Sequence, residues 1–150
     1  MAKDSHRSLV VSLIVIALGG LLMMALTLVV YGLLFNLFES LFFPNNSLLF
    51  PAGPFRMIFT IAMVLLYLLL LRTQLLDLLK AILLTVPVSA VTITVGNALN
   101  ERPSVSIPAM LVAITICGLL LYQFKKPWFY YYAGTIAALV ALAYAWPRAG

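Results

Sequence analysis

The side chains that could carry out catalysis are few in this 150-residue chain. The only histidine is His6, the only cysteine is Cys117, and the only aspartates are Asp4 and Asp77. A nucleophile paired with a histidine, a zinc site and a pair of aspartates around magnesium all need more of these groups close together. We therefore expect no catalytic residues, no metal site and no cofactor. An enzyme that modifies lipids is the least favoured function.

A stripe of small polar residues on one predicted helix points to a different chemistry, the passage of a small solute. Its members follow steps of four, three, four and four residues, so they share one helical face. Thr94 lies on the far side of that helix, and Asn97 lies beside the stripe. A proline in the stripe leaves a backbone carbonyl without its usual donor. The stripe consists of Thr85, Ser89, Thr92, Gly96 and Asn100, and together with Pro87 these residues form the candidate polar path.

This stripe has two interpretations. A polar face beside a broken hydrogen-bond ladder is typical of solute paths in membrane proteins. Alternatively, serine and threonine hydroxyls donate to carbonyls of their own helix and serve as small packing residues. The residue pattern alone leaves both interpretations open.

Two other predicted helices carry faces of small residues at four-residue spacing. Lipid gives no hydrophobic drive for helix association, so membrane helices associate through close contacts between such residues. We expect these faces to pack against helices of this chain or of a second copy. They consist of Ala109, Ala113 and Cys117 on one helix, and of Ala133, Ala137, Ala141 and Ala145 on the next.

A basic and aromatic run, which includes Lys125, Lys126, Trp128 and Tyr130, separates these two helices. Anionic lipid headgroups attract lysines by about 1 kcal/mol each, and aromatic rings settle at the membrane interface. The run predicts an interfacial anchor and is a candidate contact for lipid headgroups. Two lysines are too few to neutralise a track of phosphates. We therefore expect membrane lipids, and no nucleic acid, as partners.

The composition identifies the elements that must position these residues. Hydrophobic residues make up 65% of the chain and charged residues 9%, against about 45–50% and about 25% in soluble proteins. We therefore expect an all-α, polytopic integral membrane helix bundle. A spanning helix needs about 20 apolar residues. Five stretches qualify within a single transmembrane domain, and a four-helix alternative places the short second stretch at the interface. The stretches are about 9–38, 55–72, 81–99, 107–124 and 128–146.

The distribution of Lys and Arg predicts how this bundle is oriented. With five spans, six of these residues fall on the side of the N-terminus and three on the other side. The excess of positive charge marks the cytoplasmic side. We therefore expect a cytoplasmic N-terminus and an external C-terminus, in a bacterial or archaeal cytoplasmic membrane. The six are Lys3, Arg7, Arg72, Lys80, Lys125 and Lys126, and the three are Arg56, Arg102 and Arg148.

These features favour a non-enzymatic subunit or accessory component of a membrane complex. The small-residue faces and the lack of buried charge suggest a homo-oligomer or a complex with a partner membrane subunit. The alternative function is a carrier or channel for a small neutral or weakly polar solute along the polar path.

Overall fold

The computed structural model describes residues 2–146, which form five α-helices, one short 3₁₀ helix and no strand. All five α-helices are long and apolar enough to span a membrane. The all-α, five-helix expectation is confirmed, and the helices indicate an integral membrane protein. The elements are α1 (Ala2–Phe42), η1 (Ser47–Leu49), α2 (Ala52–Leu71), α3 (Asp77–Ala98), α4 (Pro103–Gln123) and α5 (Trp128–Ala145).

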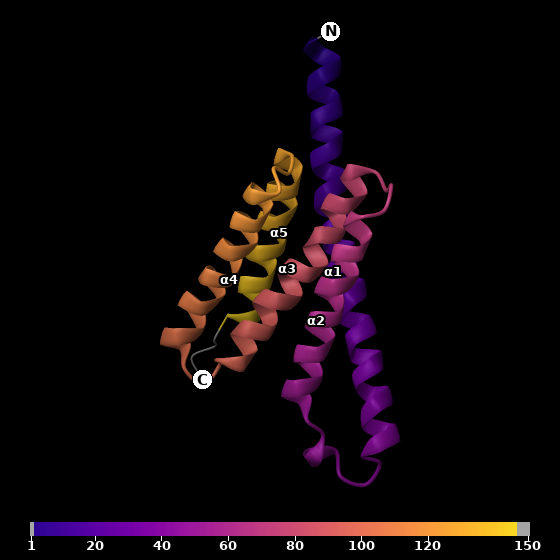
Figure 1. Ribbon diagram of the computed structural model, residues 1–150, viewed down its shortest axis with the longest axis vertical. Coiled ribbons are helices and arrows are strands. Elements are labelled where there is room, and N and C mark those ends of the chain that lie inside the picture. The colour runs from indigo at the N-terminus through magenta and orange to yellow at the C-terminus, as the bar shows by residue number, and fades with distance from the viewer. Residues whose placement is uncertain (1, 147–150) are drawn as a thin grey trace.

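Successive helices run in alternating directions (Figure 1). The start of α1 and the connections after α2 and α4 lie at one end of the molecule, here called the amino end. The connections after α1 and α3 lie at the opposite end, here called the hairpin end. Helix α1 extends beyond the other helices at both ends, and α1 and α2 form a hairpin that projects at the hairpin end.

Helix α1 is longer than the predicted stretch 9–38, because it begins at Ala2 and ends at Phe42. The apolar run marks only the part of a helix that suits hydrocarbon. Backbone hydrogen bonding continues through polar residues, so the helix includes the charged segment before residue 9. For the same reason α3 begins at Asp77 rather than near residue 81, and α4 begins at Pro103 rather than near residue 107.

Helix α3 lies at the centre of the bundle and contacts each of the other four helices. In its most apolar segment 50% of the residues are buried, against 11% in α2 and in α4. The outer helices therefore present most of their apolar side chains outward, as lipid-facing helices do. Helix α3 runs without a break through Pro87, which is buried.

Small residues bring α3, α4 and α5 close together. Ala133, Ala137 and Ala141 of α5 are completely buried. A Cβ atom added at Gly96 of α3 would lie 2.7 Å from Met110 Sδ and 2.8 Å from Ala145 Cβ. No larger side chain fits at Gly96 unless α5 or Met110 shifts.

A pair of glycines fixes how α1 sits against α3. A Cβ atom added at Gly20 would lie 2.8 Å from Thr85 Cγ2, and one added at Gly19 would lie 3.1 Å from Ile82 Cδ1. The first turns of α3 therefore lie level with Gly19 and Gly20. This register leaves roughly half of α1 beyond these contacts on the side of the hairpin end.

Candidate functional site

The predicted polar path on α3 is mostly buried. The hydroxyls of Thr85, Ser89 and Thr92 each donate a hydrogen bond of 2.7–3.0 Å to a backbone carbonyl of α3 three or four residues earlier. Gly96 faces α4 and α5, and its carbonyl accepts a hydrogen bond of 3.2 Å from the Ser106 hydroxyl. Asn100 is exposed just beyond the end of α3. A solute path along these residues stays a prediction.

The two small-residue faces lie inside the bundle to different extents. The four alanines of α5 are all buried. Ala109, Ala113 and Cys117 of α4 are partly buried, and Cys117 packs against the core. The chain therefore covers its own α5 face, which is no longer available to a second copy in this conformation.

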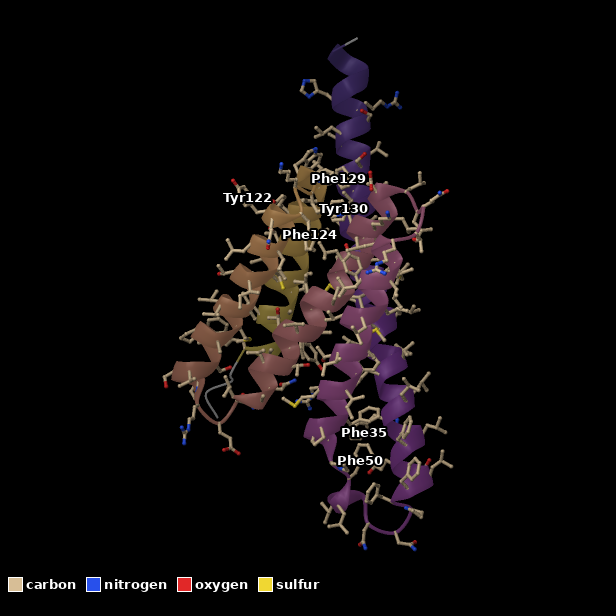
Figure 2. All side chains as sticks on the ribbon, in the orientation of Figure 1. Phe35, Phe50, Tyr122, Phe124, Phe129 and Tyr130 are labelled. Carbon is tan, nitrogen blue, oxygen red and sulfur yellow. The ribbon has the colours of Figure 1, made fainter. Side chains whose placement is uncertain are left out.

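The basic and aromatic run lies at the amino end. Lys126 Nζ lies 5.3 Å from the centre of the Tyr130 ring, and Lys125 and Trp128 are exposed. Tyr130 is completely buried, and its hydroxyl makes no hydrogen bond with residues 2–146. Figure 2 shows Tyr130 near the top of α5, beside Phe129. Contact of this run with lipid headgroups stays a prediction.

A pocket of about 150 Å³ lies between the α1–α2 hairpin and α3. Its walls are three helical faces with residues at intervals of three and four, which places them on one side of each helix. One aromatic residue from the last turn of α5 completes the rim. The lining residues are Met24, Thr27, Leu28 and Tyr31 of α1, Arg56, Phe59 and Thr60 of α2, Ser89, Ala90, Ile93, Thr94 and Asn97 of α3, and Tyr144 of α5.

Several hydroxyls around this pocket already have partners. Thr60 Oγ1 and Thr94 Oγ1 lie 2.6 Å apart in a hydrogen bond that joins α2 to α3. The Thr27 hydroxyl donates to the Met23 carbonyl at 2.8 Å. These hydroxyls are therefore unavailable to a guest molecule, which would have to bind to other lining residues.

The free groups are mainly hydrogen-bond donors. Within the described part of the chain, the Arg56 guanidinium, the Asn97 amide and the Tyr31 hydroxyl make no hydrogen bond, and Arg56 makes no ion pair. All three side chains are partly buried. The pocket therefore suits a guest that accepts hydrogen bonds.

Aromatic side chains extend from the pocket to the end of the hairpin. The Tyr31 ring centre lies 5.1 Å from that of Phe59, and the Phe35 ring centre lies 4.7 Å from that of Phe50. Figure 2 shows Phe35 and Phe50 near the projecting end of the hairpin. This set, here called the aromatic tip, consists of Tyr31, Phe35, Phe38, Phe42, Phe43, Phe50, Phe55 and Phe59.

The aromatic tip projects past the end of α5. Tyr31 and Tyr144 line the same pocket, and Tyr144 is one residue from the end of α5. From Tyr31 to Phe42, α1 continues for about 16 Å at 1.5 Å per residue. Along this projection Leu41 is 65% exposed and Phe42 66% exposed. At the turn of the hairpin Leu48 is 99% exposed.

The pocket is not among the sites predicted from the residue pattern. Thr94 and Asn97 lie off the polar stripe, yet both line the pocket. Their face, 90, 93, 94 and 97, has the same spacing as 24, 27, 28 and 31 on α1, which is a detectable signal. Each face mixes polar and apolar residues, and nothing in the sequence says that the two faces meet.

Comparisons with known proteins add no further residues to these sites. The chain matches no known protein family, no curated protein and no solved structure. Among the side chains that the structure describes, no group of three His, Cys, Asp or Glu lies close enough to hold a metal ion.

Proposed function

We propose that this chain is a non-enzymatic accessory component of a membrane complex, and that the aromatic tip binds a partner membrane subunit. The observation that carries the proposal is the position of the tip. It consists of aromatic side chains, of which Phe38 and Phe42 are exposed beside the exposed Leu41 and Leu48, and it lies on the hairpin that projects beyond α3, α4 and α5 (Figure 1).

Charged residues support a position of the tip outside the hydrocarbon layer. Lys80, Lys125 and Lys126 lie at the amino end, and Glu101 and Arg102 lie at the other end of α3 and α4. Ionised groups avoid hydrocarbon, so these residues place α3, α4 and α5 across a layer that is about 30 Å thick. The glycine contacts hold α1 against α3, which supports a position of the outer part of the tip beyond this layer.

The shape and composition of the tip favour a subunit of different sequence. An exposed apolar patch of this kind is typical of an interaction site, and aromatic side chains are common anchors of protein interfaces. A protrusion is best buried by a concave surface, and two protruding tips cannot enclose each other. Of the two small-residue faces suited to self-association, the α5 alanine face is already covered by the chain itself, and the α4 face is partly covered.

The orientation of the chain is part of the same proposal. The amino end carries six of the nine Lys and Arg residues of the full sequence. The positive-inside rule places that end in the cytoplasm. The tip then faces the outside of a bacterial or archaeal cytoplasmic membrane, and the partner must have a domain or loop there.

Site-specific photo-crosslinking in native membranes tests the proposal. A photoreactive residue at Leu41 or Leu48 is expected to give one discrete product that contains a second protein. The matched control is Leu22, which is 68% exposed but lies midway along the membrane portion of α1, so it should crosslink only to lipid. If only uncrosslinked chain is recovered with the photoreactive residue at Leu41 and at Leu48, the proposal is wrong. A product that contains only two copies of this chain would mean that the tip forms a homo-oligomer and does not bind a partner subunit.

A carrier or channel for a small neutral or weakly polar solute is the second candidate function. It is favoured by Ser89, which belongs both to the predicted path and to the pocket. A path along the stripe predicts that cysteines at Ser89, Thr92 and Gly96 react with a water-soluble thiol reagent while one at Thr94 does not. Entry through the pocket predicts reaction at Ser89 and Thr94 only. If none of the four cysteines reacts with the reagent, transport by either route is contradicted.

A further inference from the structure

Arg56 is the one charged side chain among the described residues that line the pocket beside α3. It is partly buried, and among the side chains that the structure describes (6–46 and 48–146) none forms an ion pair with its guanidinium. Withdrawing a charged group from water costs free energy unless the group is paired. An anion that accepts two parallel hydrogen bonds from the guanidinium would offset that cost.

The surroundings of Arg56 favour an anion over a cation or a neutral group. No Asp or Glu is among the described residues that line the pocket. Glu101 is exposed and follows the end of α3, and Glu39 lies eight residues beyond Tyr31 toward the tip, about 12 Å along α1. Asn97 and Tyr31 supply two further donors at the pocket wall. A phosphate or carboxylate group there meets donors and no opposing carboxylate.

The rest of the pocket surface is mainly apolar and opens toward lipid, because the hydroxyls of Thr27, Thr60, Ser89 and Thr94 are already hydrogen-bonded within the chain. Met24 is 6% exposed at the back of the pocket, whereas Leu28 is 43% and Tyr144 61% exposed at its rim. These rim side chains lie on membrane helices, so a guest enters from the bilayer. The volume of about 150 Å³ is smaller than the roughly 300–1,000 Å³ of drug-sized pockets. The pocket therefore holds one part of a larger molecule.

We propose that this pocket binds an acidic amphiphile, whose phosphate or carboxylate group is held by Arg56, Asn97 and Tyr31. Its apolar chain lies against Met24, Leu28 and Ile93 and continues into the bilayer. The site shares Tyr31 and Phe59 with the inner end of the aromatic tip, but its ligand would not occupy the exposed surface at Phe38 and Phe42, so the site does not depend on the partner subunit proposed above. It also differs from the neutral solute of the carrier hypothesis, because its ligand must be negatively charged.

Native mass spectrometry of the full chain in a neutral detergent tests this site with three probes. Lysophosphatidic acid supplies the anion and the chain, lysophosphatidylcholine supplies the chain with a zwitterionic headgroup, and inorganic phosphate supplies the anion alone. We expect one bound lysophosphatidic acid and at least tenfold weaker binding of lysophosphatidylcholine. An excess of inorganic phosphate should not displace the lipid. Equal binding of the two lipids, or displacement by phosphate, contradicts the proposal.

Arg56 in α2 and Arg72, which directly follows α2, provide a matched pair of variants. Arg56→Gln is expected to weaken lysophosphatidic acid binding by about tenfold or more, the effect of losing charge-assisted hydrogen bonds. Arg72→Gln removes the same charge at the exposed other end of α2, outside the pocket, and should leave the affinity within about twofold. Equal losses in both variants would show general attraction to a basic surface and overturn the proposal.

A variant that keeps Arg56 provides an independent test. Ile93→Trp fills the apolar part of the pocket and should weaken binding of the lipid, while Arg56 and the net charge stay the same. This variant also decides the question if Arg56→Gln does not fold. Unchanged binding in a folded Ile93→Trp protein would mean that the lipid lies elsewhere.

Discussion

The two sides of α3 are packed in different ways. Toward α4 and α5, alanine side chains and Gly96 allow the backbones to come close, and the four alanines are buried. Toward α1 and α2, close contact is limited to Gly19 and Gly20, and further along these helices large aromatic rings meet one another. The pocket of about 150 Å³ lies on this second side, and a smaller pocket of about 90 Å³ lies between α3, α4 and α5.

This difference shows how side-chain size divides a small membrane bundle into a more closely packed half (α3, α4 and α5), here called the closed half, and a less closely packed half (α1, α2 and α3), here called the open half. Membrane helices gain stability from close contact, which small residues permit over their whole length. Rings as large as those of Phe and Tyr hold helices further apart, and they pack efficiently only where their shapes match. A ligand pocket and a projecting tip are therefore expected on the aromatic side.

A single added methyl group gives the strongest test of the closed half. Gly96→Ala is expected to destabilise the protein by about 1–3 kcal/mol, because the new Cβ must displace Met110 or move α5 at Ala145. Unfolding in a graded mixture of mild and denaturing detergent measures the effect. Gly118→Ala on α4 is the control, because nothing lies within 4 Å of its added Cβ. Equal stability of the two variants would contradict close packing at Gly96.

Two buried tyrosines, Tyr67 and Tyr130, are expected to respond differently to replacement by phenylalanine, and both effects on stability should be smaller than that of Gly96→Ala. The Tyr67 hydroxyl donates to the Lys80 carbonyl at 3.2 Å, so Tyr67→Phe should lower stability by about 0.5–1.5 kcal/mol. The Tyr130 hydroxyl is buried and makes no hydrogen bond within residues 2–146, so Tyr130→Phe should leave stability unchanged or raise it. The same unfolding measurement applies. A larger loss from Tyr130→Phe than from Tyr67→Phe would reverse the expected order.

The hydrogen bond between Thr60 and Thr94 gives the smallest effect and tests the open half. Thr60→Val and Thr94→Val each remove the bond while nearly keeping the volume of the side chain. Interhelical hydrogen bonds in membrane proteins average about 0.6 kcal/mol in double-mutant cycles. We expect a coupling of that size between the two substitutions, measured as the departure of the double variant from additivity. Full additivity would mean that α2 and α3 are not joined at this point.

The sequence predicts the closed half better than the open half. Apolar runs identify five helices because length and hydropathy are local properties. The four-residue spacing of the α5 alanines marks a packing face because membrane helices use small residues in this way. Both features can be recognised without knowledge of which helices are neighbours.

The open half depends on contacts that no local pattern contains. Thr94 was placed opposite the polar stripe, and that side of α3 is the one that meets Thr60 of α2. Arg56 was assigned only as a charge near the end of a span, although the pocket wall surrounds it. The register between α1 and α3 follows from Gly19 and Gly20, and only the three-dimensional structure shows that they meet Ile82 and Thr85.

The position of the hairpin end relative to the membrane is the central claim, and cysteine labelling tests it directly. Purified chain with Cys117→Ala is placed in lipid nanodiscs and treated with a water-soluble maleimide. Leu48→Cys at the turn of the hairpin is expected to react rapidly. Leu22→Cys, which is also exposed but faces lipid, should stay unlabelled. If Leu48→Cys is as unreactive as Leu22→Cys, the hairpin lies within the hydrocarbon layer, and the proposed site of partner binding is wrong.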